Sequence, residues 1–310
     1  MPITLPPISR RRFLSASLAA TAGLALGCSS HSHPTSTISS SSNPNRFILL
    51  SDIHIAADPA VTAHNINMTS HLQQVVSESL SIDPTGSSRP SQVIVNGDCA
   101  FDTGNPEDYT QVLSLLRPYR QAGLPVHLSL GNHDNRQHLA AAVAPEQHPL
   151  PDRRVMLLPT PRADFILLDS LDKTKSTPGL LGPEQLAWLQ STLDARQSKP
   201  VIVMLHHQPQ IHEPKHHFNG LIDTPALMDI LLPRKQVKLL LFGHTHQWSY
   251  KQTQGLHLVN LPTTAYVFDP KQPAAWVDCQ LQPASGQLQL HCLDKSHPHN
   301  NQILDLPWRA

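Results

Sequence analysis

Five short polar motifs hold the residues of this chain that could do chemistry, and each motif follows an apolar run. In chain order the motifs are Asp52 with His54, Gly97-Asp98, Gly131-Asn132-His133-Asp134, His206-His207, and Gly243 with His244 and His246. Imidazole nitrogens and carboxylate or amide oxygens suit Fe, Mn or Zn ions where no thiolate is present. One such motif alone is commonplace, but five in one chain indicate a single metal site.

Buried strands must position these motifs. Continuous apolar runs predict such strands at residues 46–51, 92–96, 124–130, 200–205 and 237–242. In open α/β sheets, ligands bind at the carboxyl ends of the strands. Residues two apart on an extended strand point the same way, so Asp52 and His54 can reach one cation. A glycine before Asp98 lets the backbone approach a ligand closely.

The remaining elements are predicted from periodicity and from proline positions. Helices are expected at residues 62–80, 106–121, 136–143, 183–197 and 225–231. Antiparallel pairs are expected for residues 155–158 with 164–168, and for residues 276–281 with 288–293. Cys279 and Cys292 lie on the two arms of the second pair, but a simple register does not place them opposite each other. A disulfide between them stays an open question.

Composition narrows the class of protein. Hydrophobic residues make up 39% of the 310 residues and the mean hydropathy is −0.25, which is typical of a soluble chain that can bury a core. The 23 basic and 23 acidic residues cancel, so charge gives no reason to expect nucleic-acid binding. Histidine is the outlier with 20 residues, several of them at predicted strand ends.

Residues 1–28 are predicted to be an export segment. Arg10 and Arg11 precede an apolar stretch, Phe13–Leu26, and together they resemble a twin-arginine signal. The apolar stretch is too short for an ordinary membrane-spanning helix. We therefore expect export across the cytoplasmic membrane, to a periplasmic or membrane-anchored location.

Cys28 closes a sequence that resembles a bacterial lipobox, so it is the candidate site of lipidation and of membrane tethering. The match is imperfect, because Ala25 stands where a branched apolar residue is usual. Simple cleavage and an uncleaved anchor are the alternatives. Residues 29–45 are rich in serine and predict a linker without a core-forming pattern.

The five motifs, in this order, resemble those of the calcineurin-like metallophosphoesterase superfamily, over roughly residues 47–267. The run His206-His207-Gln208-Pro209 and the small size are most similar to the bacterial branch related to class III cyclic-nucleotide phosphodiesterases. The resemblance implies a four-layer α/β/β/α sandwich of two mixed sheets, with a dinuclear metal site at the strand carboxyl ends. We expect this domain to cover residues 46–295, with a C-terminal tail at 296–310.

The resemblance also implies a ligand set for two divalent or trivalent metal ions, Fe, Mn or Zn. The residues that hold the first metal are Asp52, His54 and His246. Those that hold the second are Asn132, His206 and His244. Asp98 bridges the two ions, which would lie about 3.5–4 Å apart. A metal-bound hydroxide would then attack phosphorus in line, with its pKa lowered by the cations.

Further roles follow from the same resemblance. His133 is expected to contact the phosphoryl oxygen or to protonate the leaving group, with Asp134 orienting it. Arg136 and His207 are possible substrate contacts. Of the two adjacent histidines we favour His206 as the metal ligand, because it directly follows the strand.

The sequence therefore predicts a metal-dependent phosphoric ester hydrolase that acts on small phosphodiesters or phosphomonoesters. The alternatives are a phosphomonoesterase or nucleotidase, and a non-catalytic metal-binding lipoprotein of the envelope. The pocket walls are expected to come from the loops at residues 58–67, 102–108 and 210–223, where no motif names a substrate. The oligomeric state stays open.

Overall fold

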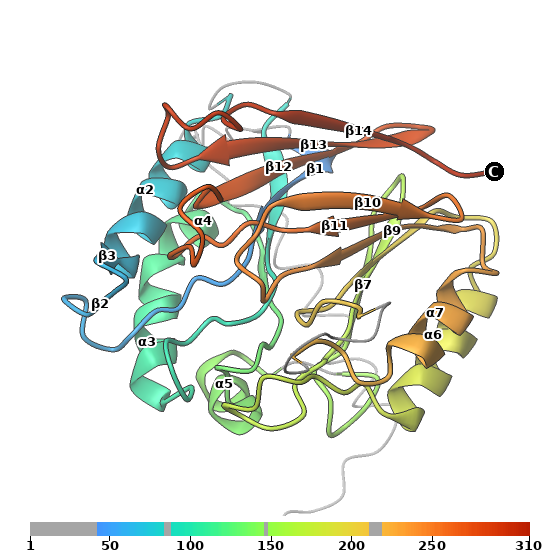
Figure 1. Cartoon of the computed structure of the whole chain (residues 1–310), viewed down its shortest axis with the longest axis horizontal. Coiled ribbons are helices and arrows are strands. Elements are labelled where there is room, and N and C mark those ends of the chain that lie inside the picture. Colours follow the sequence, from blue (N-terminus) through green and yellow to red (C-terminus); the bar gives the residue numbers. More distant parts are fainter. Residues whose placement is uncertain (1–41, 84–87, 146–147, 211–218) are drawn as a thin grey trace, which may run out of the picture. The chain divides into compact units, whose positions relative to one another are not determined.

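The computed structural model of this chain describes residues 42–83, 88–145, 148–210 and 219–310 (Figure 1). The predicted export segment, Cys28 and residues 29–41 of the predicted linker lie outside these described residues. Within the described ranges, no helix is both long enough and apolar enough to cross a bilayer.

The first sheet has six strands in the order β14-β13-β12-β1-β4-β5. The strands are β1 (Asn43–Leu50), β4 (Pro90–Val95), β5 (Val126–Leu128), β12 (Ala275–Leu281), β13 (Ser285–Cys292) and β14 (Ile303–Pro307). Strands β1, β4 and β5 run parallel, with Leu50 beside Val95 and Val95 beside Leu128. The carboxyl ends of these three strands therefore share one edge of the sheet.

The second sheet also has six strands, in the order β10-β11-β9-β8-β7-β6. The strands are β6 (Met156–Pro159), β7 (Asp164–Leu167), β8 (Val201–Met204), β9 (Val237–Phe242), β10 (Ser249–Thr253) and β11 (Leu256–Asn260). Strands β7, β8 and β9 are parallel, and Met204 at the end of β8 lies beside Leu241 near the end of β9. Both outermost strands are antiparallel to their neighbours, so this sheet is mixed, like the first.

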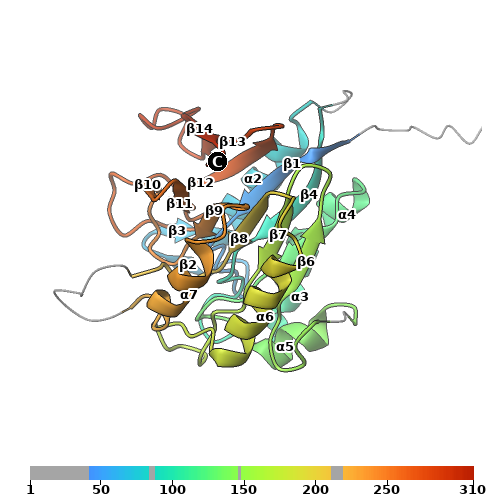
Figure 2. The same cartoon turned by 90° about the vertical axis from the view of Figure 1, so that its right-hand side faces the viewer.

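Helices cover the two outer faces of the pair of sheets. They are α2 (Met68–Leu80), α3 (Pro106–Leu115), α4 (Arg117–Gln121), α5 (Arg136–Ala142), α6 (Pro183–Asp194) and α7 (Thr224–Leu231). The first four share a core with β1, β4 and β5, whereas α6 and α7 share another core with β7, β8 and β9. Figure 2 shows α6 and α7 in front of the strands of the second sheet. The predicted four-layer sandwich is confirmed.

Alternate residues of β1 serve two different cores. Phe47 and Leu49 point between the sheets, where the Phe47 ring packs on Phe165 of β7 with 4.8 Å between the ring centroids. Ile48 and Leu50 point the other way, into the core beneath the helices α2 to α5. Side chains alternate in this way along any strand. Burial on both faces explains why β1 is a continuous apolar run in the sequence.

The predicted helix at residues 62–80 is shorter than expected. Helix α2 begins at Met68, and the six residues before it form a two-stranded hairpin of β2 (Thr62–Ala63) and β3 (Ile66–Asn67). Its two turn residues, His64 and Asn65, have φ angles of 51° and 64°. Positive φ at both central residues is the mark of a tight hairpin turn, and it is incompatible with a continuing helix.

Other predicted bounds also change. The helix expected at residues 106–121 is broken at Leu116 into α3 and α4. Pro118 is the physical reason, because it has no N–H to donate to the carbonyl of Ser114. The predicted elements do not include β10 and β11. Strand β10 is largely polar and exposed and lacks an apolar run, whereas β11 is a buried segment of only five residues.

The prediction that residues 296–310 form a separate tail is wrong. Strand β14 pairs with β13 through five residue pairs and extends the first sheet. Beyond it, the guanidinium of Arg309 donates to the backbone carbonyls of Leu231, Arg234 and Val237, on the second sheet and its helices. The last residues of the chain therefore belong to the domain.

The three cysteines among the described residues are free thiols. Cys279 lies opposite Leu288, and Cys292 lies opposite Ala275, so the two cysteines of the hairpin are separated along the ladder. The open question of a disulfide between Cys279 and Cys292 is thereby answered in the negative.

Candidate metal centre

The five motifs converge where the carboxyl ends of the central strands of both sheets meet. Strands β1, β4 and β5 of the first sheet and β8 and β9 of the second lead into them. Backbone hydrogen bonds join the loops that follow. The N–H of Asp52 donates to the carbonyl of Gly97 at 3.2 Å, and the N–H of Gly243 donates to the carbonyl of His206 at 2.9 Å. The predicted ligands are thus brought together from segments nearly two hundred residues apart.

Five of the predicted ligands have left-handed backbone conformations. The φ angles are 53° at Asp52, 46° at His54, 47° at Asp98, 69° at His244 and 54° at His246. Such angles are uncommon for residues other than glycine and cost about 1–3 kcal/mol each. Strain of this kind persists only where the surroundings impose it, and it concentrates at functional sites. Its clustering here supports the interpretation of these five residues as one site.

Two glycines are required by the close approach of the loops. A Cβ atom on Gly131 would lie 2.1 Å from Oδ1 of Asp98, and one on Gly243 would lie 2.2 Å from Oγ of Ser51. Neither distance is possible for real atoms, so any side chain there would displace the neighbouring loop. This explains why glycine stands before the polar residues of both motifs.

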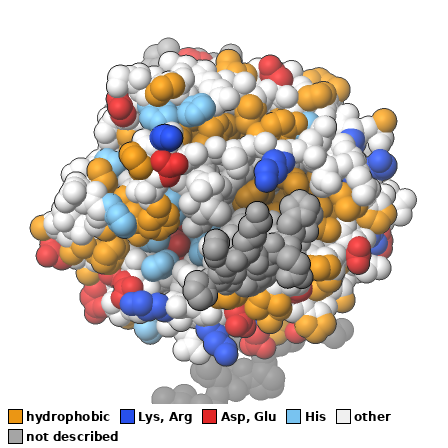
Figure 3. Space-filling view, in the orientation of Figure 1, with side chains coloured by type: hydrophobic (Ala, Val, Ile, Leu, Met, Phe, Trp, Pro, Cys, Tyr) orange, Lys and Arg blue, Asp and Glu red, His pale blue; other side chains and the backbone are white. Residues whose placement is uncertain are grey.

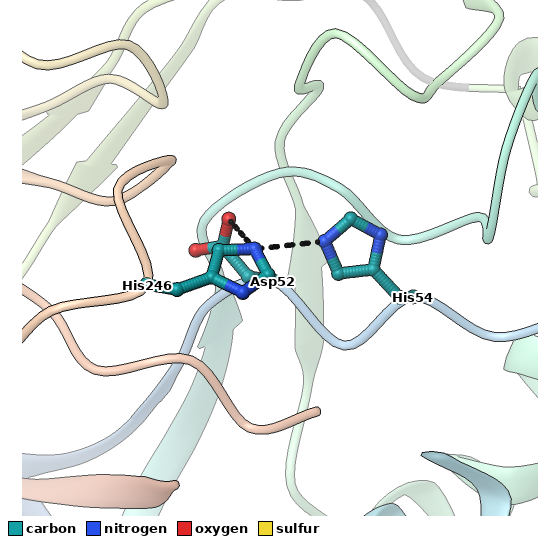
Figure 4. A group of neighbouring side chains, drawn as sticks. All are labelled: Asp52, His54 and His246. Carbon is teal, nitrogen blue, oxygen red and sulfur yellow. Dashed lines mark hydrogen bonds and ion pairs between the residues drawn. The ribbon is translucent and has the colours of Figure 1, made fainter. Parts of the chain in front are cut away.

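The first group of donors consists of Asp52, His54 and His246 (Figure 4). Nε2 of His246 lies 3.1 Å from Nε2 of His54 and 3.4 Å from Oδ1 of Asp52. Nδ1 of His246 lies 2.6 Å from the carbonyl oxygen of Tyr266. A carbonyl can only accept, so Nδ1 carries the proton and Nε2 presents its lone pair to the other two side chains. Converging lone pairs of this kind fit a metal ion.

The second group consists of Asp98, His206 and His244. Nε2 of His206 lies 3.2 Å from Oδ2 of Asp98, while its Nδ1 lies 3.0 Å from the carbonyl oxygen of Asn96. The Oδ1 atom of Asn132 is buried and has no hydrogen-bond partner in the described structure. Such a buried acceptor costs about 1–3 kcal/mol unless a cation or a donor meets it. The environment of Asn132 is therefore one that suits its predicted role as a metal ligand.

Asp98 belongs to both halves of the site. Besides the second group, it forms a third set of close donors with His54 and His133. Its Oδ2 atom lies 3.6 Å from Nε2 of His54 and 3.2 Å from Nε2 of His206. A carboxylate between two donor sets can bridge two cations, and the residues of this site fit a dinuclear metal centre.

One protonated histidine offsets part of the charge of the two buried carboxylates in the site. Burial disfavours the anions of Asp52 and Asp98, but the charge of His206 and the hydrogen bonds from neighbouring histidines together outweigh it, so the pKa of Asp52 falls to about 2 and the pKa of Asp98 falls well below its usual value. Burial also lowers the pKa of His206, and the two carboxylates more than offset this and raise it to about 10. Burial lowers the pKa values of His54 and His244 to about 4. At neutral pH His206 thus carries the proton that a metal ion would replace.

His133 lies at the edge of the site. Its backbone N–H donates to Oδ1 of Asp98 at 2.9 Å, and its Nδ1 lies 3.0 Å from the carbonyl oxygen of Asp102. The ring meets that of His54 edge to face, with 4.9 Å between the centroids. Nδ1 therefore donates to that carbonyl, and the ring lies close to His54 and Asp98, which belong to the two donor groups. A contact from Nε2 to a phosphoryl oxygen, which can only accept, requires a proton on Nε2 as well. This geometry is compatible with the predicted contact to a phosphoryl oxygen.

The prediction that Asp134 orients His133 is wrong. The Asp134 carboxylate accepts hydrogen bonds from the backbone N–H groups of Cys99, Ala100 and Gly131, and from the hydroxyl of Tyr109. It therefore holds together the loops that follow β4 and β5, and the ring of His133 is oriented by the Asp102 carbonyl instead. Burial and the charge of Asp98 raise the pKa of Asp134 to about 6.

Two possible substrate contacts are engaged elsewhere. The guanidinium of Arg136 donates to both carboxylate oxygens of Asp169, at 2.7 and 3.0 Å, and to the carbonyl of Leu171. These bonds leave the predicted substrate contact of Arg136 without support. His207 is fully buried, with Nδ1 2.8 Å from Oγ of Ser170, and burial holds its pKa well below the usual value. It lies behind His244, with 4.9 Å between the ring centroids, and away from solvent.

Sequence reasoning missed the groups that orient the histidines of the candidate site. These groups are the backbone carbonyls of Asn96, Phe101, Asp102 and Tyr266. Any residue can supply a carbonyl, so no residue type at these positions could have signalled the role. The ring of Tyr266, 4.9 Å from that of His246, was also missed.

Comparisons with known proteins agree with the geometry. A family model described as calcineurin-like phosphoesterase matches residues 45–248. The chain belongs to this family, and it is therefore a metal-dependent phosphoric ester hydrolase. Its two mixed sheets are those that the resemblance of the motifs implied, and its clustered His and Asp residues fit a dinuclear site.

Individual relatives have more specific names. A probable cyclic nucleotide phosphodiesterase of Synechococcus sp. is 30% identical over 254 residues, which are 81% of this chain and 93% of the relative. A 3′,5′-cyclic adenosine monophosphate phosphodiesterase of Pseudomonas aeruginosa is 28% identical over 245 residues, which are 79% and 85% of the two chains. A dimetal phosphatase from Danio rerio superposes with a TM-score of 0.65 and 15% identity, covering 85% of this chain and 99% of that one. At this identity the last comparison concerns the fold alone.

Asn132→Ala should lower the metal content toward one ion per chain and reduce hydrolysis at least a hundredfold, because the second group loses an oxygen ligand. Elemental analysis and a phosphoesterase assay on the same sample measure both quantities. Gln252→Ala, which removes an exposed amide on β10, is the matched control and should change neither. Full metal content together with full turnover in Asn132→Ala would remove this residue from the site.

Metal binding should release about one proton per chain at pH 7, because His206 has a pKa of about 10 whereas His54 and His244 are already neutral. The sign follows from competition: below pH 10 the proton and the metal exclude each other, so apparent affinity rises with pH. Calorimetric titration in two buffers with different heats of ionisation measures the number of protons. A heat that is independent of the buffer would show that His206 is neutral before binding.

Proposed function

We propose that this protein is a cyclic-nucleotide phosphodiesterase that works with two Fe, Mn or Zn ions and acts outside the cytoplasmic membrane. The observation that carries the proposal is the convergence of seven nitrogen and oxygen donors on one edge of two sheets, with none of the expected ligands lost. A non-catalytic metal-binding protein would have no need to retain the complete set. The names of the relatives from Synechococcus sp. and Pseudomonas aeruginosa support the choice of substrate class.

The residues of the site divide the work between them. Asp52, His54 and His246 would hold one ion, and Asn132, His206 and His244 the other, with Asp98 between them. Two such cations supply positive charge for the phosphoryl oxygens and lower the pKa of water. His133 lies beside the first group, where, with a proton on Nε2 as well as on Nδ1, the ring can donate to a phosphoryl oxygen or give the Nε2 proton to the leaving oxygen.

The donor set also supports the choice of metals. It contains histidine, aspartate and asparagine, and the buried Cys99 next to Asp98 donates to a backbone carbonyl. Burial and the nearby carboxylates raise the pKa of this thiol well above its ordinary value, so it stays protonated and is a poor ligand. Nitrogen and oxygen donors without thiolate suit Fe, Mn and Zn.

The substrate class can be tested with the purified chain loaded with Mn²⁺. We expect hydrolysis of 3′,5′-cyclic adenosine monophosphate to the monophosphate, and a kcat/KM at least tenfold above that for the monoester 4-nitrophenyl phosphate. Asp98→Asn should abolish both activities, because it removes the bridging charge while keeping the shape. Asp229→Asn, at an exposed position on α7, is the matched control and should retain them.

Preference for the monoester would identify a phosphatase instead. Two bound metals without turnover of either substrate would favour the metal-binding protein. Either result would reject the proposed substrate class.

The proposed location rests on the sequence of the first 28 residues, which precede the described structure. The arginine pair, the apolar stretch and the lipobox-like end at Cys28 support export followed by lipid anchoring. Cys28→Ala should move the protein from the membrane fraction to the soluble fraction of the cell envelope, as measured by fractionation and immunoblotting. Persistent membrane association would favour an uncleaved anchor, and retention in the cytoplasm of the unaltered protein would reject export.

A further inference from the structure

An exposed aromatic ring stands directly beside the first donor group, and the roles described above do not use it. Phe268 lies in the loop between β11 and β12 and is 61% exposed, the largest value among the described large hydrophobic residues that are exposed. One face of its ring is stacked on His246, with 4.5 Å between the centroids and 24° between the planes. Because that face is covered, the exposure belongs to the opposite face and the edge.

A second ring is supplied by the hairpin of β2 and β3. His64 is the first residue of its tight turn and is exposed. Its ring is stacked on that of Tyr266, with 4.6 Å between the centroids and 26° between the planes. The tight turn fixes the backbone beneath His64, and Tyr266 covers one face of the imidazole. The other face is left toward solvent.

The two rings meet nearly at right angles. The centroids of His64 and Phe268 are 5.5 Å apart and their planes differ by 82°. Tyr266 contacts both of them and is itself 5.2 Å from the ring of His54. The result is an aromatic corner, defined here as His64 and Phe268 supported by Tyr266, that is continuous with two metal ligands. Figure 3 shows histidine and hydrophobic side chains close together at the left of the molecule, where β2 and β3 lie in Figure 1.

The geometry of this corner selects for a flat ligand group. A planar ring can stack on one of the two open faces while its edge meets the other, and both arrangements are favourable for aromatic pairs. Single exposed hydrophobic residues are common on protein surfaces and need no explanation. Here the exposed ring is packed against a ligand histidine, so whatever stacks on it lies next to the phosphate-binding metal centre.

We propose that the aromatic corner of His64 and Phe268 receives the base of a nucleotide whose phosphate is held at the metal centre. The inference rests on the proposed function and deepens it, because it assigns the residues that would distinguish a nucleotide from other phosphate esters. In such a ligand a single sugar separates the base from the phosphate, which suits a ring that packs directly on His246. The loop at residues 58–67 is one of those predicted to form the pocket walls, and His64 is its residue in the aromatic corner.

The test compares two ligands that differ only in the base: adenosine 5′-monophosphate and ribose 5-phosphate. Their dissociation constants are measured by calorimetry on the Mn²⁺-loaded chain. Replacing an aromatic side chain that stacks on a base by alanine typically weakens binding about five- to hundredfold. At this exposed site we expect affinity to fall about fivefold to tenfold. The unaltered protein should therefore bind the nucleotide about tenfold more tightly than the sugar phosphate.

Phe268→Ala should reduce this ratio to about one through weaker binding of the nucleotide, while binding of ribose 5-phosphate stays within twofold. Phe268→Trp should keep the ratio or raise it. His64→Ala should produce a smaller loss in the same direction. Ile303→Ala removes a similarly exposed hydrophobic side chain from β14 and is the matched control, with no change in the ratio.

An equal affinity for both ligands in the unaltered protein, or an unchanged ratio in Phe268→Ala, would overturn the assignment. Loss of affinity for both ligands together would show that Phe268 only supports His246 and would overturn it too. Because binding and not turnover is measured, the result is separate from the proposed function. Preferential nucleotide binding without hydrolysis of a cyclic nucleotide would reject that function and keep the corner.

Discussion

Two carboxylates buried side by side at the carboxyl ends of β1 and β4 are the constraint on which this structure depends. Asp52 and Asp98 are almost completely removed from solvent, and each opposes the charge of the other. Buried charges must be paired or coordinated to be tolerated. Without a metal ion, the protonated His206 provides part of this compensation. Backbone carbonyls hold Nδ1 of His54, His206 and His246, so their Nε2 atoms are directed inward, where a cation would meet them. A phosphoesterase needs that same arrangement, a dense set of donors that only a cation can satisfy.

The sandwich makes this cluster possible by holding its backbone in unfavourable conformations. Five candidate ligands have positive φ angles, which are uncommon for residues other than glycine even though Asp and His tolerate them better than most. The compensation comes from the close packing of two sheets, from glycines that admit neighbouring loops, and from Asp134, whose carboxylate ties three backbone N–H groups together. Asp134 therefore contributes to the site by fixing the backbone of the loops, and it takes no direct part in the reaction.

The aromatic corner has a different relation to the site. Its rings pack on the outer side of His54 and His246, so they support the metal ligands and face solvent at once. The metal centre of such an enzyme recognises a phosphate group, which many metabolites share. Discrimination between these metabolites must come from surfaces one sugar away, and the corner is such a surface.

Much of this protein could be predicted from the sequence, because strand burial and ligand chemistry are local properties. Apolar runs that end in Asp, Asn or His indicated the five strand ends, and the resemblance of the motifs to a known family implied the two-sheet sandwich and the seven candidate ligands. Tertiary structure alone decided that Asp134 bonds to distant N–H groups, that Arg136 pairs with Asp169, and that β14 and Arg309 join the domain. It also decided that His64 turns in a hairpin and meets Phe268. These features depend on backbone groups and rings that come together from distant parts of the chain. The type of a single residue does not indicate which distant groups it will contact.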